Sequence, residues 1–414
     1  MGYFDTNMTL TKEDIALKES AHKFAETVMR PISIQLDKMT AEQVIAPDSP
    51  YWDFMRKAYK LGYHKLPFPE EVGGPGLTPL QMALVYEELA WGSFGMTLAL
   101  TTSFDAALAA EGGEELMKEF TIPFINCTDA SYIGCWAVTE PDHGSDPCIV
   151  GLPAFYDPKI KAQCRAHLEG DEYVINGQKS AWVSGAPTAK TILLMCQVDP
   201  SRGFAGGGMF VFSLDRPGVT KGKPCECVGA RELNQGAIFF DNVRVARKYL
   251  VVGPDRYEEV LRGHISMTTV MVGLWGVGLA RAAFEEGLKY ARVREQGGKL
   301  LTEHSFIRSK LFDMFMKIEA ARQLCRSVMI YNWGNPPEKR VMELGLAAKN
   351  FGTQVALEVT TDVIQILGSN GLTPEYLTEK LWRDARTTTI CDGSNDTNSI
   401  VGGKMIAETY PPKR

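Results

Sequence analysis

One carboxylate stands on a predicted bend near the C-terminal end of this 414-residue chain, in the sequence Asp392-Gly393-Ser394. Gly393 permits backbone torsions that residues with a Cβ resist, so the carboxylate can be presented by a turn instead of a helix face. Ser394 and Asn395 are favourable N-caps for a helix that follows. A carboxylate held in this way can act as a general base, whereas an isolated turn aspartate is more often a capping residue.

The surrounding stretch, Thr361–Gly403, resembles the C-terminal signature of the acyl-CoA dehydrogenases. The matching elements, in order, are QILG at 365–368, EY at 375–376, RD at 383–384 and a carboxylate-Gly-Ser triplet at 392–394. In most of that family the carboxylate is a glutamate that removes the α-proton of an acyl thioester. Here the matching residue is Asp392, one methylene shorter, and a related branch, the nitroalkane oxidases, also has aspartate there.

A second motif, CWAVTEPDHGSD at 135–146, resembles the TEPxxGSD signature of the same family. The resemblance implies that Trp136, Val138 and Thr139 line the flavin of an FAD cofactor. It also implies that Ser145 contacts the pantetheine or phosphate region of coenzyme A. Backbone amides and the Thr139 hydroxyl can stabilise the negative charge of a reduced flavin. The alternative is an ordinary capped β-turn.

A third motif, QKSAWVSGA at 178–186, follows a predicted strand and resembles the K-x-W-I-T/S-N-G element of the family. The resemblance implies that Trp182 stacks on the dimethylbenzene edge of the flavin and that Ser184 donates to N5. Packing of Trp182 in a β-domain core is the alternative. The family's asparagine is absent after Ser184.

Further cofactor contacts are implied on the C-terminal side. In the resembling family Arg294 would reach the flavin pyrophosphate of a neighbouring subunit, because a guanidinium donates two parallel bonds to phosphate. Gln365, Gly368 and Ser369 would complete this shared site, and Ser394 would also contact the cofactor. A solvated surface arginine is the alternative for Arg294.

Two other residues bear on the choice of base. Thr268 occupies the alternative base position of the family, and a threonine cannot take up a proton at neutral pH, so we expect it to line the substrate site. Asp105 is the only charged residue of the segment 95–110, and we expect it to be a satisfied core acid or a helix-end partner instead of a catalytic group. Asp392 is therefore the base candidate among the matched positions.

Three segments must position these residues. Residues 1–130 show helical periodicity, starting at Thr11 and Asp14, residues 131–249 show short alternating runs, and residues 250–414 return to long helices. This order predicts an α+β multidomain fold, with an N-terminal α-helical domain, a middle β-barrel or sandwich domain and a C-terminal four-helix bundle. It is also the arrangement of the acyl-CoA dehydrogenases. The segment 148–170 is expected to be irregular.

Composition limits the classes of function. A net charge of −6 argues against a nucleic-acid partner. We see no apolar run of membrane-spanning length, no signal peptide and no metal-binding pattern among nine scattered cysteines, so we expect reduced thiols, no metal, no stable membrane insertion and a cytoplasmic location. Apolar stripes on several faces of the last helices, together with the shared cofactor site, indicate a homotetramer.

The resemblance implies an FAD-dependent acyl-CoA dehydrogenase that passes electrons to an electron-transfer flavoprotein or similar acceptor. Asp392 would take the α-proton, and the β-hydrogen would leave as hydride to flavin N5. A short base would suit a cyclic, branched or otherwise bulky acyl group. The alternatives are a nitroalkane oxidase-like flavoenzyme, which Asp392 favours, and a non-redox acyl-CoA lyase or binding protein.

Overall fold

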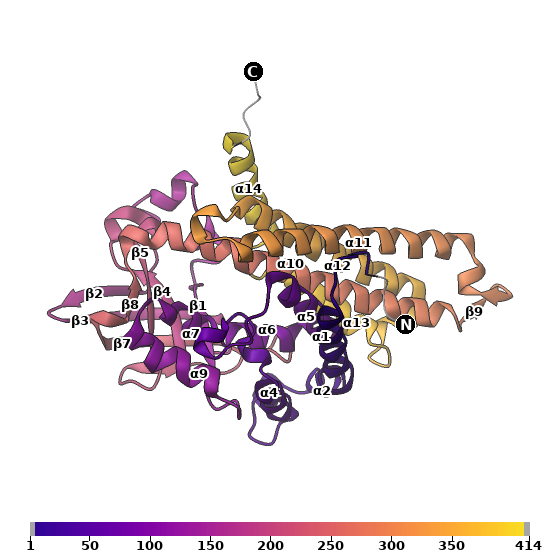
Figure 1. Ribbon diagram of the computed structural model, residues 1–414, viewed down its shortest axis with the longest axis horizontal. Helices are drawn as coiled ribbons and strands as arrows, with labels where there is room; N and C mark the ends of the chain where they lie inside the picture. Colours follow the sequence, from indigo (N-terminus) through magenta and orange to yellow (C-terminus); the bar gives the residue numbers. More distant parts are fainter. Residues whose placement is uncertain (1–4, 410–414) are drawn as a thin grey trace.

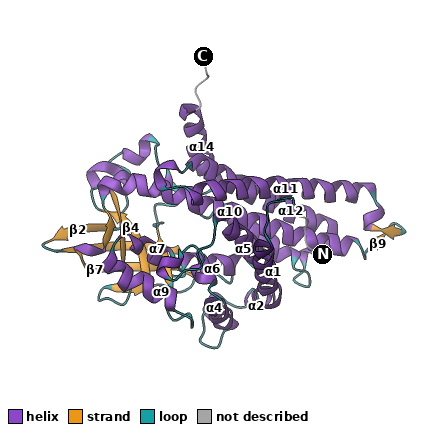
Figure 2. Ribbon diagram, viewed as in Figure 1, coloured by secondary structure: helices purple, strands orange, loops and turns teal. Residues whose placement is uncertain are grey.

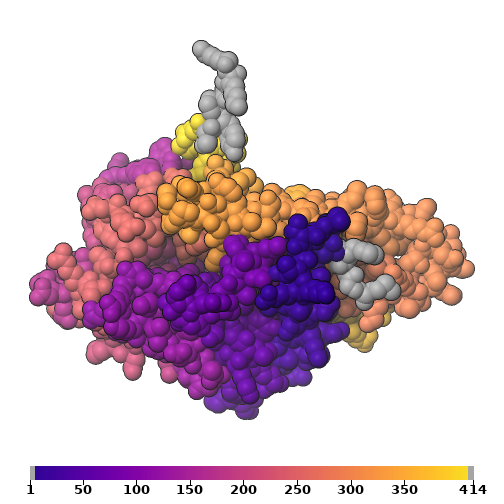
Figure 3. All heavy atoms as spheres, in the orientation of Figure 1, coloured from indigo at the N-terminus to yellow at the C-terminus, as the bar shows by residue number. Residues whose placement is uncertain are grey.

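The computed structural model describes residues 5–409. Strands gather at one end of the molecule, and helices make up the remainder, with three long helices running along its length (Figures 1 and 2). The predicted order of helical, β and helical segments is confirmed. In the space-filling view the N-terminal helices, indigo to violet, lie directly against the orange helices of the C-terminal segment (Figure 3).

The N-terminal segment is made of short helices. Thr11 begins the first of them with a capping box, in which the Asp14 amide donates to the Thr11 hydroxyl at 3.1 Å and the Thr11 amide donates to the Asp14 carboxylate at 2.9 Å. The predicted start is therefore confirmed. The helices are α1 Lys12–Phe24, α2 Arg30–Leu36, α3 Ala41–Val44, α4 Pro50–Lys60, α5 Pro79–Gly92, α6 Phe94–Thr102, α7 Asp105–Ala109, α8 Glu114–Leu116 and α9 Ile122–Asn126.

Two of these helices end inside apolar stretches of the sequence. Helix α4 ends at Lys60, because Gly62 has a φ of +82° and turns the chain out of the helix. The segment 95–110, in which Asp105 is the only charged residue, is divided between α6 and α7. Asp105 is the first residue of α7, so this break places its side chain at a helix end.

The middle segment forms one mixed eight-stranded sheet in the order β6-β7-β3-β2-β4-β5-β8, with β1 paired to β4 in parallel. Its bounds are β1 Gly134–Ala137, β2 Arg165–Glu169, β3 Glu172–Ser184, β4 Thr191–Gln197, β5 Gly207–Ser213, β6 Val219–Lys221, β7 Gln235–Ala246 and β8 Leu250–Val252. Two register shifts between β3 and β7 bend the long third strand. The segment 148–170 is irregular only in part, since β2 occupies its end.

The C-terminal segment contains the long helices, α10 Pro254–Ala291, α11 Ser305–Gly334 and α12 Met342–Leu367, then α13 Thr378–Thr388 and α14 Asn395–Thr409. A small hairpin of β9 Glu295–Gln296 and β10 Lys299–Leu300 joins the first two. By length and composition alone α10 could cross a membrane, which the sequence reading missed, but 89% of its most apolar window is buried inside the protein. Gly273 and Gly352 allow α10 and α12 to touch, since a Cβ on either would meet the opposite backbone within 2.5 Å.

Candidate active site

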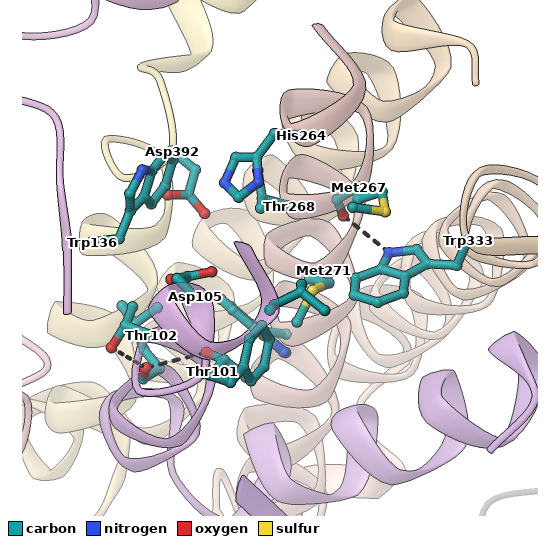
Figure 4. Close-up of a pocket in the computed structure, with 14 residues that line it drawn as sticks. Thr101, Thr102, Asp105, Trp136, His264, Met267, Thr268, Met271, Trp333 and Asp392 are labelled. Carbon is teal, nitrogen blue, oxygen red and sulfur yellow. Dashed lines mark hydrogen bonds between the residues drawn. The ribbon is translucent and has the colours of Figure 1, made fainter. Parts of the chain in front are cut away.

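A cavity of about 430 Å³, partly open to solvent, lies where the N-terminal helices, β1 and the helices α10 and α11 meet. Its wall is mostly apolar, but the titratable side chains of Asp105, His264 and Asp392 face it (Figure 4). Thr268 lies in the wall as well. The predicted base and the residue at the alternative base position are therefore brought into one cavity.

Asp392 lies on a bend between α13 and α14, as its sequence context predicts. Its φ of +52° and the φ of +82° at Gly393 place two consecutive residues in the left-handed region. Aspartate and asparagine tolerate that region better than other residues with a Cβ. Within the described chain, the backbone amide of Asp392 donates to no protein acceptor, so both its N–H and its carboxylate are available to a ligand.

Polar contacts from two other elements hold the bend in place. The Lys349 ammonium, on α12, donates to the Gly393 carbonyl and to the Asn395 side chain, each at 2.7 Å. The Ser394 amide donates to the Ser145 hydroxyl at 3.0 Å. Ser394 also caps α14, since its hydroxyl accepts from the Thr397 amide at 3.2 Å. Ser145, predicted from resemblance to contact coenzyme A, thus joins the two motifs directly.

The three titratable groups of the cavity have displaced pKa values. Burial raises the pKa of Asp392 to about 6, although the nearby Lys349 charge opposes the change. Burial, and then the Asp392 carboxylate, raise the pKa of Asp105 well above its usual range. Burial, helped by the Arg340 charge, lowers the pKa of His264 to about 4. At neutral pH the Asp392 carboxylate is therefore mostly ionised and the His264 imidazole is neutral, while the protonated form of Asp105 is favoured more than that of a free aspartate.

The β-domain motif lies beside this cavity. Trp136 lines it, packs edge-on against His264 with the ring centroids 4.7 Å apart, and keeps its indole N–H buried without a partner. The Thr139 hydroxyl shares a 2.7 Å hydrogen bond with Ser180 on β3. The Val138 carbonyl accepts from the buried Lys179 ammonium at 2.8 Å. These contacts fix the turn after β1 against β3.

The third motif lies on β3. The Trp182 indole is 58% exposed, so the alternative that it packs in the core of this chain is wrong. The Ser184 hydroxyl accepts from the Gln235 amide at 3.3 Å, and the same amide donates to the Trp182 carbonyl at 3.4 Å. An exposed indole beside a fixed hydroxyl offers a flat apolar platform and a hydrogen-bonding group.

The remaining predicted cofactor residues are elsewhere. Arg294 directly precedes the β9 hairpin, which lies at the opposite end of the long axis from the sheet (Figure 1). Gln365, Gly368 and Ser369 are exposed at the end of α12. The structure therefore does not bring these residues together with the β-domain motifs of the same chain, and their predicted role depends on a neighbouring subunit.

Several residues of the cavity escaped the sequence reading, Asp105 above all. It lies at a helix end as expected, but its carboxyl lines the cavity and points toward Asp392 instead of being satisfied by the protein (Figure 4). His264, Trp275 and Trp333 were read only as positions of long helices, although they also line the cavity. For Asp105, the sequence offered one signal, which is that it is the only charged residue in the segment 95–110.

Family models match the chain in three successive parts. The N-terminal domain model of acyl-CoA dehydrogenases matches residues 11–126, the middle domain model matches residues 135–243 and the C-terminal domain model matches residues 259–406. Together they cover the three segments that carry the cavity and its flanking motifs.

Individual proteins agree with these models. Cyclohex-1-ene-1-carbonyl-CoA dehydrogenase of Syntrophus aciditrophicus (strain SB) is 30% identical over 403 residues, which is 97% of this chain and 92% of that protein. The solved butyryl-CoA dehydrogenase of Megasphaera elsdenii is 26% identical, with a TM-score of 0.84 over 98% of this chain and 100% of that chain. A flavoprotein nitroalkane oxidase has the same fold, with a TM-score of 0.86 over 98% of each chain, at 21% identity.

Proposed function

Since this chain belongs to the acyl-CoA dehydrogenase family, and is thus an FAD-dependent oxidoreductase, we propose that it oxidises an acyl-CoA thioester with Asp392 as the base. The observation that carries this proposal is the position of the Asp392 carboxylate, which faces the cavity from a bend of the chain. The pKa of this carboxyl group is raised, and the backbone amide of the same residue is free to bind a ligand. The α-proton of the thioester would pass to this carboxylate, and the product would be an α,β-unsaturated acyl-CoA.

The residues present fit an FAD. The exposed Trp182 indole and the Ser184 hydroxyl on β3, together with the unpartnered Trp136 N–H and the Thr139 hydroxyl, offer a stacking surface and hydrogen-bonding groups next to the cavity. The Ser394 amide donates to the Ser145 hydroxyl, so the Asp392 bend lies next to the motif that contains Trp136 and Thr139. FAD bound there would supply the two-electron acceptor that the oxidation of the acyl group needs.

Replacing Trp182 by alanine should weaken FAD binding by about tenfold, because an aromatic stacking contact contributes about 0.5–1.5 kcal/mol beyond the area it buries. Fluorescence titration of the flavin-free protein with FAD measures this. Leu168→Ala removes another exposed apolar side chain of the same sheet, 45% exposed on β2, and should leave the affinity unchanged. Equal affinities for wild type and the Trp182 variant would remove Trp182 from the cofactor site.

Two groups of Asp392 act on the thioester in this proposal. The carboxylate is the general base, and burial brings its pKa close to the operating pH, where proton transfer is most efficient. The free backbone amide would donate to the thioester carbonyl and stabilise the negative charge that develops as the α-proton leaves. The Lys349 ammonium donates to the Gly393 carbonyl and so fixes the bend. The carboxylate and the backbone amide of Asp392 therefore keep their positions relative to each other.

The rate of flavin bleaching should rise with pH through about 6 and level off above it. Only the ionised carboxylate can accept a proton, and burial raises the pKa of Asp392 to about 6. Burial lowers the pKa of His264 to about 4, so the imidazole stays neutral and does not lower the rate near neutral pH. Rapid mixing with a saturating acyl-CoA at a series of pH values measures the profile. A rate that falls with pH would contradict the assignment.

A bulky acyl group suits this cavity. Its wall is mostly apolar and includes Leu98, Leu108 and Met271, which suit a hydrocarbon group. An aspartate base reaches less far than a glutamate, so the α-carbon must lie closer to the bend. We therefore infer a cyclic, branched or otherwise wide acyl group instead of a long straight chain.

A nitroalkane oxidase-like activity is the second candidate, favoured by Asp392 and by the fold shared with the nitroalkane oxidase. The two activities separate in one assay, in which peroxide production from nitroethane is compared with anaerobic flavin bleaching by a panel of acyl-CoAs. We expect bleaching by an acyl-CoA and no peroxide from nitroethane. A non-redox member would bind the thioester without any bleaching.

The assembly we propose is a homotetramer, in which Arg294, Gln365, Gly368 and Ser369 complete a neighbour's FAD site. Its support is the exposed apolar surface of α11, which includes Phe306, Phe312 and Phe315. An electron-transfer flavoprotein or similar carrier would reoxidise the protein, and we place it in the cytoplasm. Analytical ultracentrifugation tests the assembly.

A further inference from the structure

Asp105 and Trp275 are two of the cavity-wall residues whose polar groups lack a partner among the described residues. Asp105 is 6% exposed, and no described residue donates a hydrogen bond to its carboxyl group or accepts one from it. Trp275, on α10, is 2% exposed, and its indole N–H is buried without an acceptor. Both residues line the cavity that contains Asp392, and Figure 4 shows Asp105 close to Asp392. Leaving such groups unpaired is costly in a folded protein.

The Trp136 N–H and His264 Nε2 of the same wall also lack a partner, and their rings pack against each other. The hydrogen bonds of three other residues of the wall are satisfied. The Trp333 indole donates to the Met267 carbonyl at 3.3 Å. The hydroxyls of Thr101 and Thr102 donate to carbonyls of their own helix α6. Missing partners are therefore confined to two parts of the wall, one at Asp105 and Trp275 and the other at the Trp136–His264 pair.

The charged groups of the cavity limit which chemical group of a substrate could bind Asp105 and Trp275. Among the described residues that line it, none is Lys or Arg, so a carboxylate on the acyl group would have no counter-charge. An ammonium group would meet the partly positive indole N–H of Trp275. Burial and the Asp392 charge raise the pKa of Asp105 well above its usual range, which favours the protonated carboxyl, a neutral donor. A neutral donor and an indole N–H both match an uncharged oxygen.

We propose that the acyl group of the substrate carries an uncharged hydroxyl or oxo oxygen beyond its β-carbon, which Asp105 and Trp275 hydrogen-bond. This inference rests on the proposed function, since it names the substrate class of the same site. Asp105 and Trp275 act as specificity residues, and Asp392 remains the base. A plain hydrocarbon acyl group would leave both groups unpaired and bind more weakly.

The test compares cyclohexanecarbonyl-CoA with its 3-hydroxy, 4-hydroxy and 4-oxo derivatives, which share one ring. Anaerobic flavin bleaching gives kcat/KM, and titration of the Asp392→Asn protein gives Kd without turnover. At least one oxygenated ring should be preferred by roughly 10- to 100-fold in both quantities, as expected for a hydrogen bond made to otherwise unpaired buried groups. Asp105→Leu and Trp275→Phe should each remove most of that preference.

Trp333→Phe is the matched control, because its indole N–H is already used by the Met267 carbonyl. It should retain the preference ratio. Thermal melting of each variant identifies any variant that fails to fold. Asp105→Asn is a second substitution at position 105, and it keeps the size of the aspartate side chain.

Four results would overturn the inference. The first is equal kcat/KM and Kd for the plain and oxygenated rings in the wild-type protein. The second is loss of preference in Trp333→Phe equal to that in Trp275→Phe. The third is tighter binding of an amino- or carboxy-substituted ring. The fourth is loss of bleaching by every acyl-CoA in a folded Asp105→Asn protein that still binds them, since Asp105 would then transfer a proton. Binding preference without bleaching in wild type would instead refute the proposed function alone.

Discussion

An Asp392→Asn protein that still binds FAD and acyl-CoA is expected to bleach its flavin roughly 1,000-fold more slowly than wild type, within the range that a general base contributes. Asparagine has the same size as aspartate and also tolerates the φ of +52° at this position. The bend, its Lys349 contacts and the backbone amide should therefore persist, and only the proton acceptor is lost. Anaerobic rapid mixing with the best acyl-CoA measures the rate.

Asp396→Asn is the control for this substitution. Asp396 is exposed in the first turn of α14, four residues after the base, and loses the same charge without facing the cavity. Its bleaching rate should equal that of wild type. Full bleaching in Asp392→Asn would show that another group takes the α-proton.

Glu87→Ala is expected to lower the free energy of unfolding by about 3–5 kcal/mol, the usual cost of removing one partner from a buried ion pair. The Glu87 carboxylate is fully buried on α5 and accepts from Arg281 at 3.0 Å, Arg322 at 3.0 Å and Arg326 at 2.9 Å. Burial alone would raise the pKa of Glu87, but the three arginines lower it below its usual range. Alanine would leave a dense group of buried cations. Urea unfolding followed by circular dichroism measures the loss.

This cluster matters for the cavity because it joins the N-terminal helices to the helices that form the opposite wall. Arg281 lies on α10, while Arg322 and Arg326 lie on α11. Glu114→Ala is the control, since its pair with Lys118 is exposed and should contribute less than about 1 kcal/mol. If Glu87→Ala lowers the free energy of unfolding no more than Glu114→Ala does, the three arginines must be stabilised by water or by other partners.

Local sequence signals were sufficient for the fold order and for the bend that carries Asp392. The capping box at Thr11, the alternating runs of the middle segment and the Asp-Gly-Ser turn all act over a few residues. Helix breaks were harder to predict, because Gly62 and the step between α6 and α7 end helices inside apolar stretches.

The other half of the cavity could not be read from local patterns. Asp105 and Trp275 are 170 positions apart in the sequence, and only the tertiary arrangement of α7, β1 and α10 around one cavity decides that both face the same space. The direct contact between Ser145 and the Ser394 amide also joins two distant motifs. Such juxtapositions depend on tertiary structure, which periodicity and turn chemistry do not encode.

A crystal structure with FAD and an unreactive acyl-CoA analogue tests the central assignment most directly. We expect an Asp392 carboxylate oxygen about 3–3.5 Å from the α-carbon, the reacting distance of a near-attack geometry. We also expect the flavin ring on the opposite face of the thioester, and the Asp392 amide donating to the thioester carbonyl oxygen. A carboxylate turned away from the α-carbon, with another group of the cavity nearest to it, would contradict the assignment.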